Sequence, residues 1–240
     1  MLIICLDGYD PDFTKDIEWK NRFDIFKTID TEDHTIASNC WVITGHGTSI
    51  RKFAWDSKEK GLFSHKDLGP PYLWELIETL NIRQAWISVP IISPLPKINN
   101  AVFIPGILSA RLEEHSDEYC RILNKREFSE EDLKKLIDID FNVYLKYKDY
   151  DFVFLYVFWL DPANHQHMTH KIKPLIDNWM NNIPLHNKTI LYSDHGVPGV
   201  GKGYVAHKPK GILGLKGINR DISHIKELNR VILEELGWKQ

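Results

Sequence analysis

Residues 151–167 read DFVFLYVFWLDPANHQH, and this stretch separates the possible classes of fold. Its first part, residues 152–160, is an apolar run of nine residues, whereas a membrane-spanning helix needs about 20. The run is rich in aromatic and β-branched side chains, which favours a strand that is buried on both faces of a sheet. Asp161 and Pro162 read as an N-cap and a first helical residue, so a helix is expected to follow the strand.

The same strand pattern recurs along the chain. It is found at residues 2–6, 84–89 and 189–193, and more weakly at residues 211–215. Apolar residues at helical spacing occupy residues 72–80, 129–148 and 221–236, and the second of these begins with the capping-box pattern SEED. Strands that alternate with helices favour a three-layer α/β/α sandwich with a mainly parallel central sheet.

A single domain is predicted for residues 1–240, because the chain contains neither an internal repeat nor a linker. Residues 89–109 include four prolines and are predicted to form a loop. Insertions that govern specificity are expected at residues 46–71 and 90–128.

Composition and charge exclude several classes of protein. The chain has 43% hydrophobic residues, as globular proteins do, and its 30 basic against 33 acidic residues offer no positive surplus for a nucleic-acid polymer or a membrane. Cys5, Cys40 and Cys120 are too few and too widely spaced for a disulfide framework or a zinc ribbon, so reduced thiols are expected. Residues 2–6 lack the flanks of a signal peptide, and the expected location is therefore cytoplasmic.

Polar residues follow three of the predicted strands at the point where each strand ends. These are Asp7, Asp161, and the pair Asp194 and His195. Each has an ordinary explanation, as a turn, a helix cap or a loop exit. In α/β sheets, however, ligands bind where the carboxyl ends of strands meet loops, and carboxylates gathered there repel one another unless cations neutralise them. His165 lies four residues after Asp161, a spacing that lets both side chains hold one ion.

Five motifs in a fixed order resemble the alkaline phosphatase superfamily, and most closely its type I phosphodiesterase and nucleotide pyrophosphatase branch. They are LIICLDG at residues 2–8, TIASNCWVITG at 35–45, FLYVFWLDPANHQH at 154–167, ILYSDHG at 190–196 and AHKPKGIL at 206–213. The resemblance implies an alkaline phosphatase-like fold over nearly the whole chain. It also implies that Thr35, nine residues before the Thr44 of a Thr-Gly pair, is the nucleophile, with Ser38 as the alternative.

The resemblance further implies two sites for divalent metal ions. One ion would be surrounded by Asp7, Thr35, Asp194 and His195, and the other by Asp161, His165 and His207. Mixed carboxylate and imidazole ligands suit zinc, with manganese as an alternative. Such ions activate a hydroxyl and stabilise the oxygens of a phosphoryl transfer. His167 and His170 compete with His207 for the last position, although a solvent-exposed helix face is the simpler interpretation of both.

Candidate substrate contacts follow the nucleophile motif. Arg51 and Lys52 would supply a cation for a monoester dianion, and Asp56 takes the place where many nucleotide pyrophosphatases have a phosphate-binding asparagine. An apolar wall for a diester would come from Trp41, Phe53, Trp55 and Phe63. The resemblance favours a phosphodiesterase that acts on a small-molecule phosphoester. The alternatives are a phosphatase of the same superfamily and a degenerate relative that binds phosphate without turnover.

Two other enzyme classes fit less well. Residues 196–202 read GVPGVGK and nearly spell a phosphate-binding P-loop, but Gly203 stands where that motif needs Ser or Thr. A serine hydrolase would need a Gly-x-Ser-x-Gly elbow, which the sequence lacks, and the adjacent residues Ser193, Asp194 and His195 cannot converge as a catalytic triad. The sequence leaves the oligomeric state open.

Overall fold

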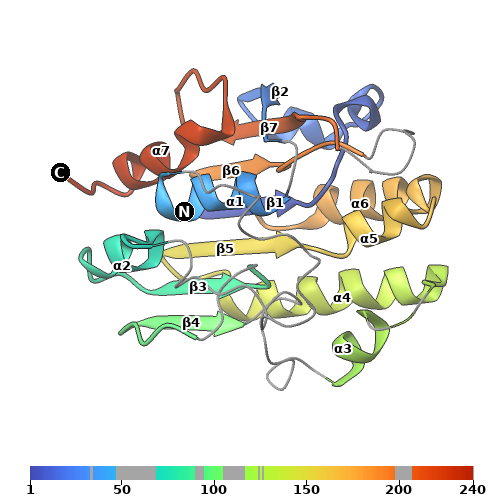
Figure 1. Ribbon diagram of the computed structural model, residues 1–240, viewed down its shortest axis with the longest axis horizontal. Coiled ribbons are helices and arrows are strands. Elements are labelled where there is room, and N and C mark those ends of the chain that lie inside the picture. The colour runs from blue at the N-terminus through green and yellow to red at the C-terminus, as the bar shows by residue number, and fades with distance from the viewer. Residues whose placement is uncertain are drawn as a thin grey trace.

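The computed structural model has a central sheet between two layers of helices (Figure 1). It describes residues 1–32, 35–46, 69–89, 95–104, 117–123, 125, 127–197 and 207–239. The strands are β1 (Leu2–Leu6), β2 (Ile25–Asp30), β3 (Gln84–Ile87), β4 (Ala101–Ile104), β5 (Phe152–Val157), β6 (Thr189–Tyr192) and β7 (Lys210–Lys216). The α-helices are α1 (Thr35–Thr44), α2 (Leu73–Glu78), α3 (Asp117–Leu123), α4 (Glu130–Tyr147), α5 (Leu160–His165), α6 (Thr169–Asn182) and α7 (Leu228–Glu235). Short 3-10 helices lie at Pro11–Thr14, Trp19–Arg22 and Ile225–Glu227.

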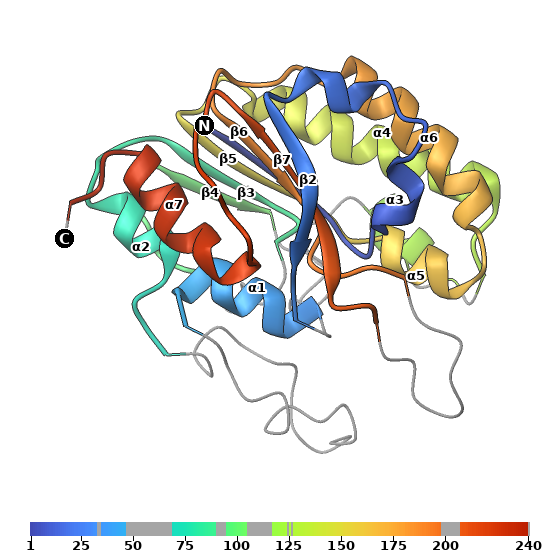
Figure 2. The same cartoon turned by 90° about the horizontal axis from the view of Figure 1, so that it is seen from above.

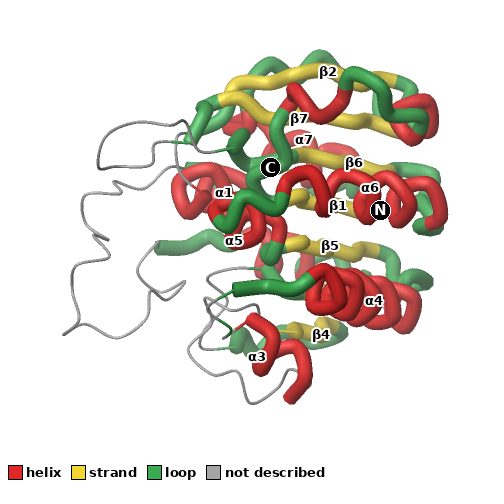
Figure 3. The backbone as a smooth tube through the Cα atoms, turned by 90° about the vertical axis from the view of Figure 1, so that its right-hand side faces the viewer, coloured by secondary structure: helices red, strands yellow, loops and turns green. Residues whose placement is uncertain are grey.

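The strands of this 7-stranded sheet follow the order β2-β7-β6-β1-β5-β3-β4 (Figure 1), and all of them except β3 are labelled in the view of Figure 3. β1 pairs in parallel with β5 and β6, and β3 pairs in parallel with β5 and β4. β7 runs antiparallel to both β6 and β2. The carboxyl ends of β1, β5 and β6 therefore lie at one edge of the sheet, and the chain enters β7 at that same edge. The predicted three-layer sandwich with a mainly parallel sheet is confirmed.

Strand β1 shows why helices cover both faces of the sheet. All of its residues are 0% exposed, and successive side chains of a strand point to opposite faces. Leu2, Ile4 and Leu6 belong to the core that packs against α4 and α6, whereas Ile3 and Cys5 belong to the core under α1, α2 and α7 (Figure 2). Because neither face of β1 is polar, both faces must be shielded from water.

Helix α4 begins with the predicted capping box. The Ser129 hydroxyl accepts a hydrogen bond from the backbone N–H of Asp132 at 3.1 Å, and the Asp132 carboxylate accepts one from the N–H of Ser129 at 2.9 Å. Each bond satisfies a backbone donor that would otherwise lack a partner at the start of the helix. The predicted helix start is confirmed.

Three elements differ from the predictions. β4 lies within residues 89–109, for which the prolines predict a loop; the prediction is wrong there because Ala101–Ile104 holds no proline and pairs with β3. β2 pairs with β7 although most of its side chains are half-buried or exposed, which weakens its apolar pattern. The last α-helix begins at Leu228 instead of residue 221, because Glu227 accepts hydrogen bonds from the backbone of Ser223 and His224 and closes a separate 3-10 turn.

Large parts of the two predicted insertions lie outside the described residues. These parts are residues 47–68 of the first and residues 90–94, 105–116, 124 and 126 of the second. The second insertion also contains β4 and α3. Among the helices of the described ranges, none combines the length and the apolarity needed to cross a bilayer.

Candidate metal centre

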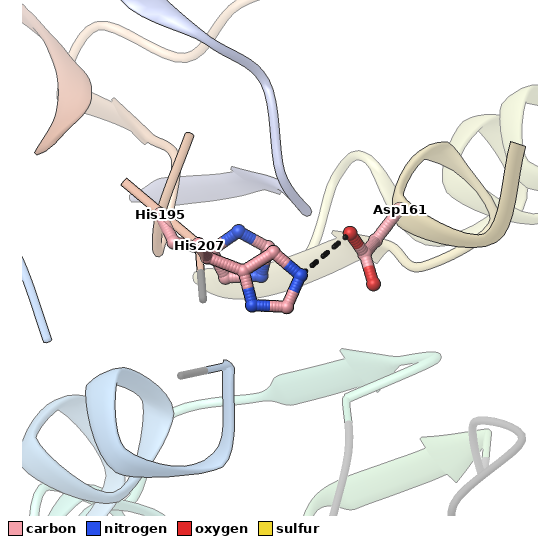
Figure 4. A group of neighbouring side chains, drawn as sticks. All are labelled: Asp161, His195 and His207. Carbon is pink, nitrogen blue, oxygen red and sulfur yellow. Dashed lines mark ion pairs between the residues drawn. The ribbon is translucent and has the colours of Figure 1, made fainter. Parts of the chain in front are cut away.

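Side chains next to the ends of four strands converge at the carboxyl edge of the sheet. Asp7 follows β1, Asp161 lies in the first turn of α5 after β5, Asp194 and His195 follow β6, and His207 precedes β7. Their ligand atoms form two groups, and within each group the atoms lie within 4.8 Å of one another: Asp7, Asp194 and His195, and Asp161, His195 and His207. Figure 4 shows the second group. We call the first group the closed pocket. The second group, together with His165, is the open pocket.

The closed pocket is part of the protein core. Asp7, Asp194 and His195 are each 0% exposed. His195 Nε2 lies 3.2 Å from Asp7 Oδ1 and 4.0 Å from Asp194 Oδ1, and the Gly8 N–H donates to the same Asp194 oxygen at 3.2 Å. Two carboxylates against one imidazole leave an excess of negative charge away from water, and a divalent cation would neutralise it.

Burial and charge together shift the protonation of the closed pocket. Burial, reinforced by the negative charge of Asp194, raises the pKa of Asp7 well above its ordinary value. Burial works against a charged imidazole, but Asp194 and Asp7 outweigh it and raise the pKa of His195 to about 10. The pocket therefore favours positive charge at its centre, and the same preference attracts a metal ion.

The orientation of the His195 ring suits a metal ligand. His195 Nδ1 lies 2.8 Å from the backbone oxygen of Gly196. A carbonyl oxygen only accepts hydrogen bonds, so Nδ1 carries a proton and donates. In a neutral imidazole the lone pair is then on Nε2, the atom that faces Asp7. Metal-binding histidines are commonly held in this way, with the other ring nitrogen bonded to a backbone carbonyl.

The open pocket is built around one carboxylate and converging histidines. The two oxygens of Asp161 lie 3.4 Å from His165 Nε2 and 3.4 Å from His207 Nε2, and these two nitrogens are 3.2 Å apart. Burial opposes ionisation of Asp161, yet hydrogen bonds from both histidines lower its pKa. Asp161 in turn raises the pKa of His165. Two imidazole nitrogens and a carboxylate aimed at the same small space form a donor set that fits a divalent metal ion.

The two pockets touch through His195. Its ring centroid lies 4.0 Å from that of His207, and its ligand atom belongs to both groups. The family resemblance assigns His195 to the first site alone and His165 to the second. The structure places His165 against Asp161 and His207, as that assignment requires, but His195 stands between the two groups.

Helix α5 begins two residues earlier than its sequence suggests. Asp161 is predicted as the N-cap, but the helix starts at Leu160 with Trp159 in the cap position, so that prediction is wrong. The reason is a tertiary bond: the Trp159 indole N–H donates to the buried Asp140 of α4 at 2.9 Å and holds the chain there. Asp161 nevertheless lies one turn before His165, and their side chains meet as predicted.

His207 is fixed by the backbone next to it. Lys208 pairs with the backbone of residues 196 and 197, since its carbonyl accepts from Gly196 N–H at 3.0 Å and its N–H donates to the Val197 oxygen at 3.4 Å. The Lys208 ammonium also binds the buried Asp10 at 3.1 Å. These contacts bring His207 beside His195, twelve residues earlier in the chain. The competing histidines, His167 and His170, are exposed and belong to neither group.

The nucleophile candidates lie on α1. Thr35 is the first residue of that helix, and its side chain is outside the described part of the structure. The Ser38 hydroxyl donates to the backbone oxygen of Asp194 at 2.6 Å and accepts from the N–H of Glu32 at 3.2 Å. Ser38 is 0% exposed, so its hydroxyl holds the structure together where a substrate cannot reach it. This disfavours the alternative nucleophile.

Several predicted contacts fall outside the described residues. They are the substrate candidates Arg51, Lys52 and Asp56, the wall residues Phe53, Trp55 and Phe63, and residues 198–202 of the P-loop-like stretch. Trp41 lies on α1, half-buried, with the Lys226 ammonium 5.0 Å from its ring centroid.

Polar residues behind the ligands were not found from the sequence. The Asn164 amide donates to the backbone oxygen of Gly8 at 3.1 Å and joins α5 to the end of β1. Asn39 and Tyr156 both donate to Asp194. Asn39 lies one turn after Thr35 on α1, and that spacing is the signal that would have indicated it.

Comparison with solved structures finds proteins with a similar fold. No protein-family model matches the chain, and no curated protein sequence matches it. An alkaline phosphatase from the Antarctic bacterium TAB5 aligns with 100% of this chain and 98% of its own at a TM-score of 0.61 and 11% identity. Human ectonucleotide pyrophosphatase/phosphodiesterase 5 aligns over 100% of this chain and 95% of its own (TM-score 0.57, 10% identity). A protein of the alkaline phosphatase superfamily from Vibrio parahaemolyticus aligns over 98% and 65% (TM-score 0.53, 13% identity).

Fold and site define a class of protein: an α/β sandwich with groups of side chains that could ligate a metal at the carboxyl edge of its sheet. Within that class, the fold is alkaline phosphatase-like, as the resemblance of the five sequence motifs led us to expect.

Proposed function

We propose that this protein is a two-metal-dependent phosphoester hydrolase of the phosphodiesterase/nucleotide pyrophosphatase type. The observation that carries the proposal is the pair of Asp/His groups that share His195 at the carboxyl edge of the sheet. Helix α1 adds support, because its Asn39 lies 2.9 Å from Asp194 and Thr35 is one helical turn earlier. The sheet edge thus gathers two groups of ligands and the start of the helix that bears the nucleophile.

The chain's own residues divide into two ligand sets. Asp7, Thr35, Asp194 and His195 would hold one ion, and Asp161, His165 and His207 the other. The mixture of carboxylate and imidazole favours zinc, with manganese as the alternative. When bound, such ions supply Lewis-acid stabilisation of the oxygens in phosphoryl transfer.

Thr35 is assigned the role of nucleophile. Its oxygen forms a bond to phosphorus as the bond to the leaving alcohol breaks, and the hydroxyl proton ends on that alcohol. Water then attacks the phosphorus of this threonine-linked ester and breaks its bond to the threonine oxygen, which releases the remaining phosphate monoester and returns a proton to the hydroxyl. Backbone N–H groups in the first turn of a helix have no intrahelical partner, and those of α1 would be suited to receive the phosphoryl oxygens.

The proposed substrate is a small phosphodiester, with weaker hydrolysis of monoesters. Arg51, Lys52 and Asp56 are retained as proposed substrate contacts. A nucleic-acid polymer is not expected, because 30 basic and 33 acidic residues give a net charge of -3. A cytoplasmic location is favoured by Cys5 and Cys40, which are buried free thiols.

A metal analysis combined with a substrate comparison tests the proposal. The purified protein should carry two equivalents of a divalent metal, and bis(p-nitrophenyl) phosphate should give a higher kcat/KM than p-nitrophenyl phosphate. Thr35→Ala should lower kcat at least about 10³-fold while metal content is unchanged. Ser38→Ala is the matched control and should keep most of kcat.

Three outcomes would contradict the proposal in different ways. Full activity in a verified metal-free sample would exclude the two-metal chemistry. Activity that survives Thr35→Ala and disappears in Ser38→Ala would exchange the nucleophiles. A monoester preference that collapses in Arg51→Ala or Lys52→Ala would make the protein a phosphatase.

A further inference from the structure

A chain of buried polar side chains stands behind Asp194, on the side away from His195. Its members are Asn39 of α1, Tyr156 of β5 and Tyr192 of β6, which we call the Asp194 bracket. All three residues are 0% exposed, as is Asp194. Polar groups this deep in a core cost stability unless they are bonded, so their arrangement calls for an explanation.

The bracket donates hydrogen bonds to one carboxylate oxygen of Asp194 and not to the other. The Asn39 amide and the Tyr156 hydroxyl both donate to Asp194 Oδ2, at 2.9 Å and 3.1 Å. The other oxygen, Oδ1, accepts from Gly8 N–H and faces His195 in the closed pocket. The two oxygens of Asp194 therefore have different tasks.

Tyr192 determines which way the Asn39 amide points. The Tyr192 hydroxyl donates to Asn39 Oδ1 at 2.9 Å, so the amide oxygen is directed toward the phenol. The amide nitrogen must then face Asp194 and Tyr156, which lies 3.3 Å away. In the opposite orientation, the Asn39 oxygen would meet the carboxylate, and two acceptors would repel each other.

We propose that Asn39 and Tyr156 are positioning residues that make Asp194 bind its ion through Oδ1 alone. Resting on the proposed function, the inference adds that Asn39 couples α1, and so Thr35, to the closed pocket. Two donors on Oδ2 stop the carboxylate from turning and keep Oδ1 directed toward the closed pocket. Because Asn39 is on the same helix as Thr35, a shift of α1 would move a metal ligand and the nucleophile together.

The test measures zinc affinity in single-atom variants. Tyr156→Phe removes only the hydroxyl that reaches Asp194, and Tyr192→Phe removes only the bond that orients Asn39. Tyr144→Phe is the matched control, because its buried hydroxyl donates to the backbone oxygen of Pro184, away from the centre. Zinc dissociation constants are measured for the full chain by competition with a chromogenic chelator, in a His165→Ala background that weakens the open pocket.

Tyr156→Phe should weaken zinc binding by about 10- to 100-fold, the effect typical of a lost partner behind a ligand. Tyr192→Phe should weaken zinc binding less. Tyr144→Phe should leave zinc binding unchanged, even if its melting temperature falls as far as that of Tyr156→Phe. The absorption spectrum of the cobalt-loaded protein should shift in Tyr156→Phe and not in Tyr144→Phe.

Two failures are distinguishable. If the parent protein binds zinc and Tyr156→Phe binds it equally well with an unchanged cobalt spectrum, the bracket is only part of the core and the inference is overturned. If the parent protein binds neither zinc nor manganese and hydrolyses no phosphoester, the proposed function itself fails.

Discussion

The closed and open pockets share His195 but are built in different ways. The closed pocket has two carboxylates and one histidine, whose side chains are at most 1% exposed. In the open pocket, one carboxylate meets histidines, and the side chain of His165 is 38% exposed. Strand ends within the core position the first set, whereas a short helix and the entry to β7 position the second. Similar ligand chemistry is thus placed in one rigid and one accessible setting.

This difference predicts unequal metal binding. Charge attracts a cation more strongly to the closed pocket, because two carboxylates face a single imidazole there and water does not screen them. Exchange is easier in the open pocket, where solvent reaches a ligand directly. We therefore expect a tightly held ion at Asp7 and Asp194 and a more readily exchanged ion at Asp161.

The largest expected effect comes from removing a closed-pocket ligand. Asp194→Ala should lower kcat/KM at least about 10³-fold and reduce the bound metal from two equivalents to one or fewer. The reason is that both an ion-binding oxygen and the acceptor of the bracket are lost. His167→Ala, which changes an exposed histidine, is the control and should stay within about twofold of the parent protein. Equal losses of kcat/KM in the two variants would contradict the assignment of Asp194 as a metal ligand and of His167 as a residue outside the site.

Changes in the open pocket should have the next largest effect. His165→Ala should lower kcat/KM by about 10- to 100-fold. It should also speed the loss of one metal equivalent to a chelator while the other equivalent remains. Timed chelation followed by metal analysis measures this directly. A single phase in the parent protein, with both ions released together, would contradict the ranking of the two pockets.

Gly8 allows both pockets to be disturbed at once. It has a φ of 65°, and an added Cβ would lie 3.1 Å from Asp161 Oδ1 and 3.2 Å from His195 Cε1. Gly8→Ala should therefore destabilise the protein by about 1–2 kcal/mol through its left-handed backbone and weaken both ions together. Gly69→Ala is the matched control, because it has a similar backbone conformation and an added Cβ would meet none of the described residues within 4 Å. Equal zinc affinity in the two variants would show that Gly8 is needed only for its backbone conformation and not for the space beside Asp161 and His195.

The smallest effect on the centre is expected from Asp140, which supports the open pocket through Trp159. Burial raises the pKa of Asp140 from 3.8 to about 7, although hydrogen bonds from Trp159 and Tyr119 oppose the shift. Between these values the unfolded chain has released the proton and the folded protein has kept it. Stability therefore falls as pH rises from about 4 to 7, by up to about 4 kcal/mol, and the penalty is complete above pH 7.

Asp140→Asn keeps an acceptor for Trp159 and removes this ionisation. In urea unfolding of the metal-free protein, the variant should be more stable than the parent at pH 8, and the difference should shrink as pH falls toward 4. Zinc affinity should be unchanged. A constant difference at all pH values would mean that Asp140 is ionised in the folded protein.

The sequence predicted the inner strands well and the outer strands poorly. β1, β5 and β6 are buried throughout, so their apolar runs carry a strong signal. β2 has mixed burial, with Lys27 and Asp30 among its residues, and owes its strand conformation to pairing with β7. Long-range pairing of this kind leaves little trace in local composition.

A similar limit applies to the site. Asp7, Asp161, Asp194 and His195 could be predicted because residues at the ends of neighbouring parallel strands must meet. In the bracket, Asn39 has its spacing of one turn from Thr35 as a signal, but that spacing does not show that its amide reaches Asp194, 155 positions away in the sequence. The role of His195 between the pockets depends on the pairing of Lys208 with Gly196 and Val197, which brings His207 beside it and which spacing alone does not determine.

The reversed direction of β7 has a consequence for how such a protein can change over generations. His195 is anchored by the strand that precedes it, and His207 by the backbone pairing and the strand that follow it. Neither anchor depends on how many residues connect the two histidines. Insertions or deletions between positions 198 and 206 would therefore leave both imidazoles in their places. A lineage can change the number of residues there without first rebuilding its ligands.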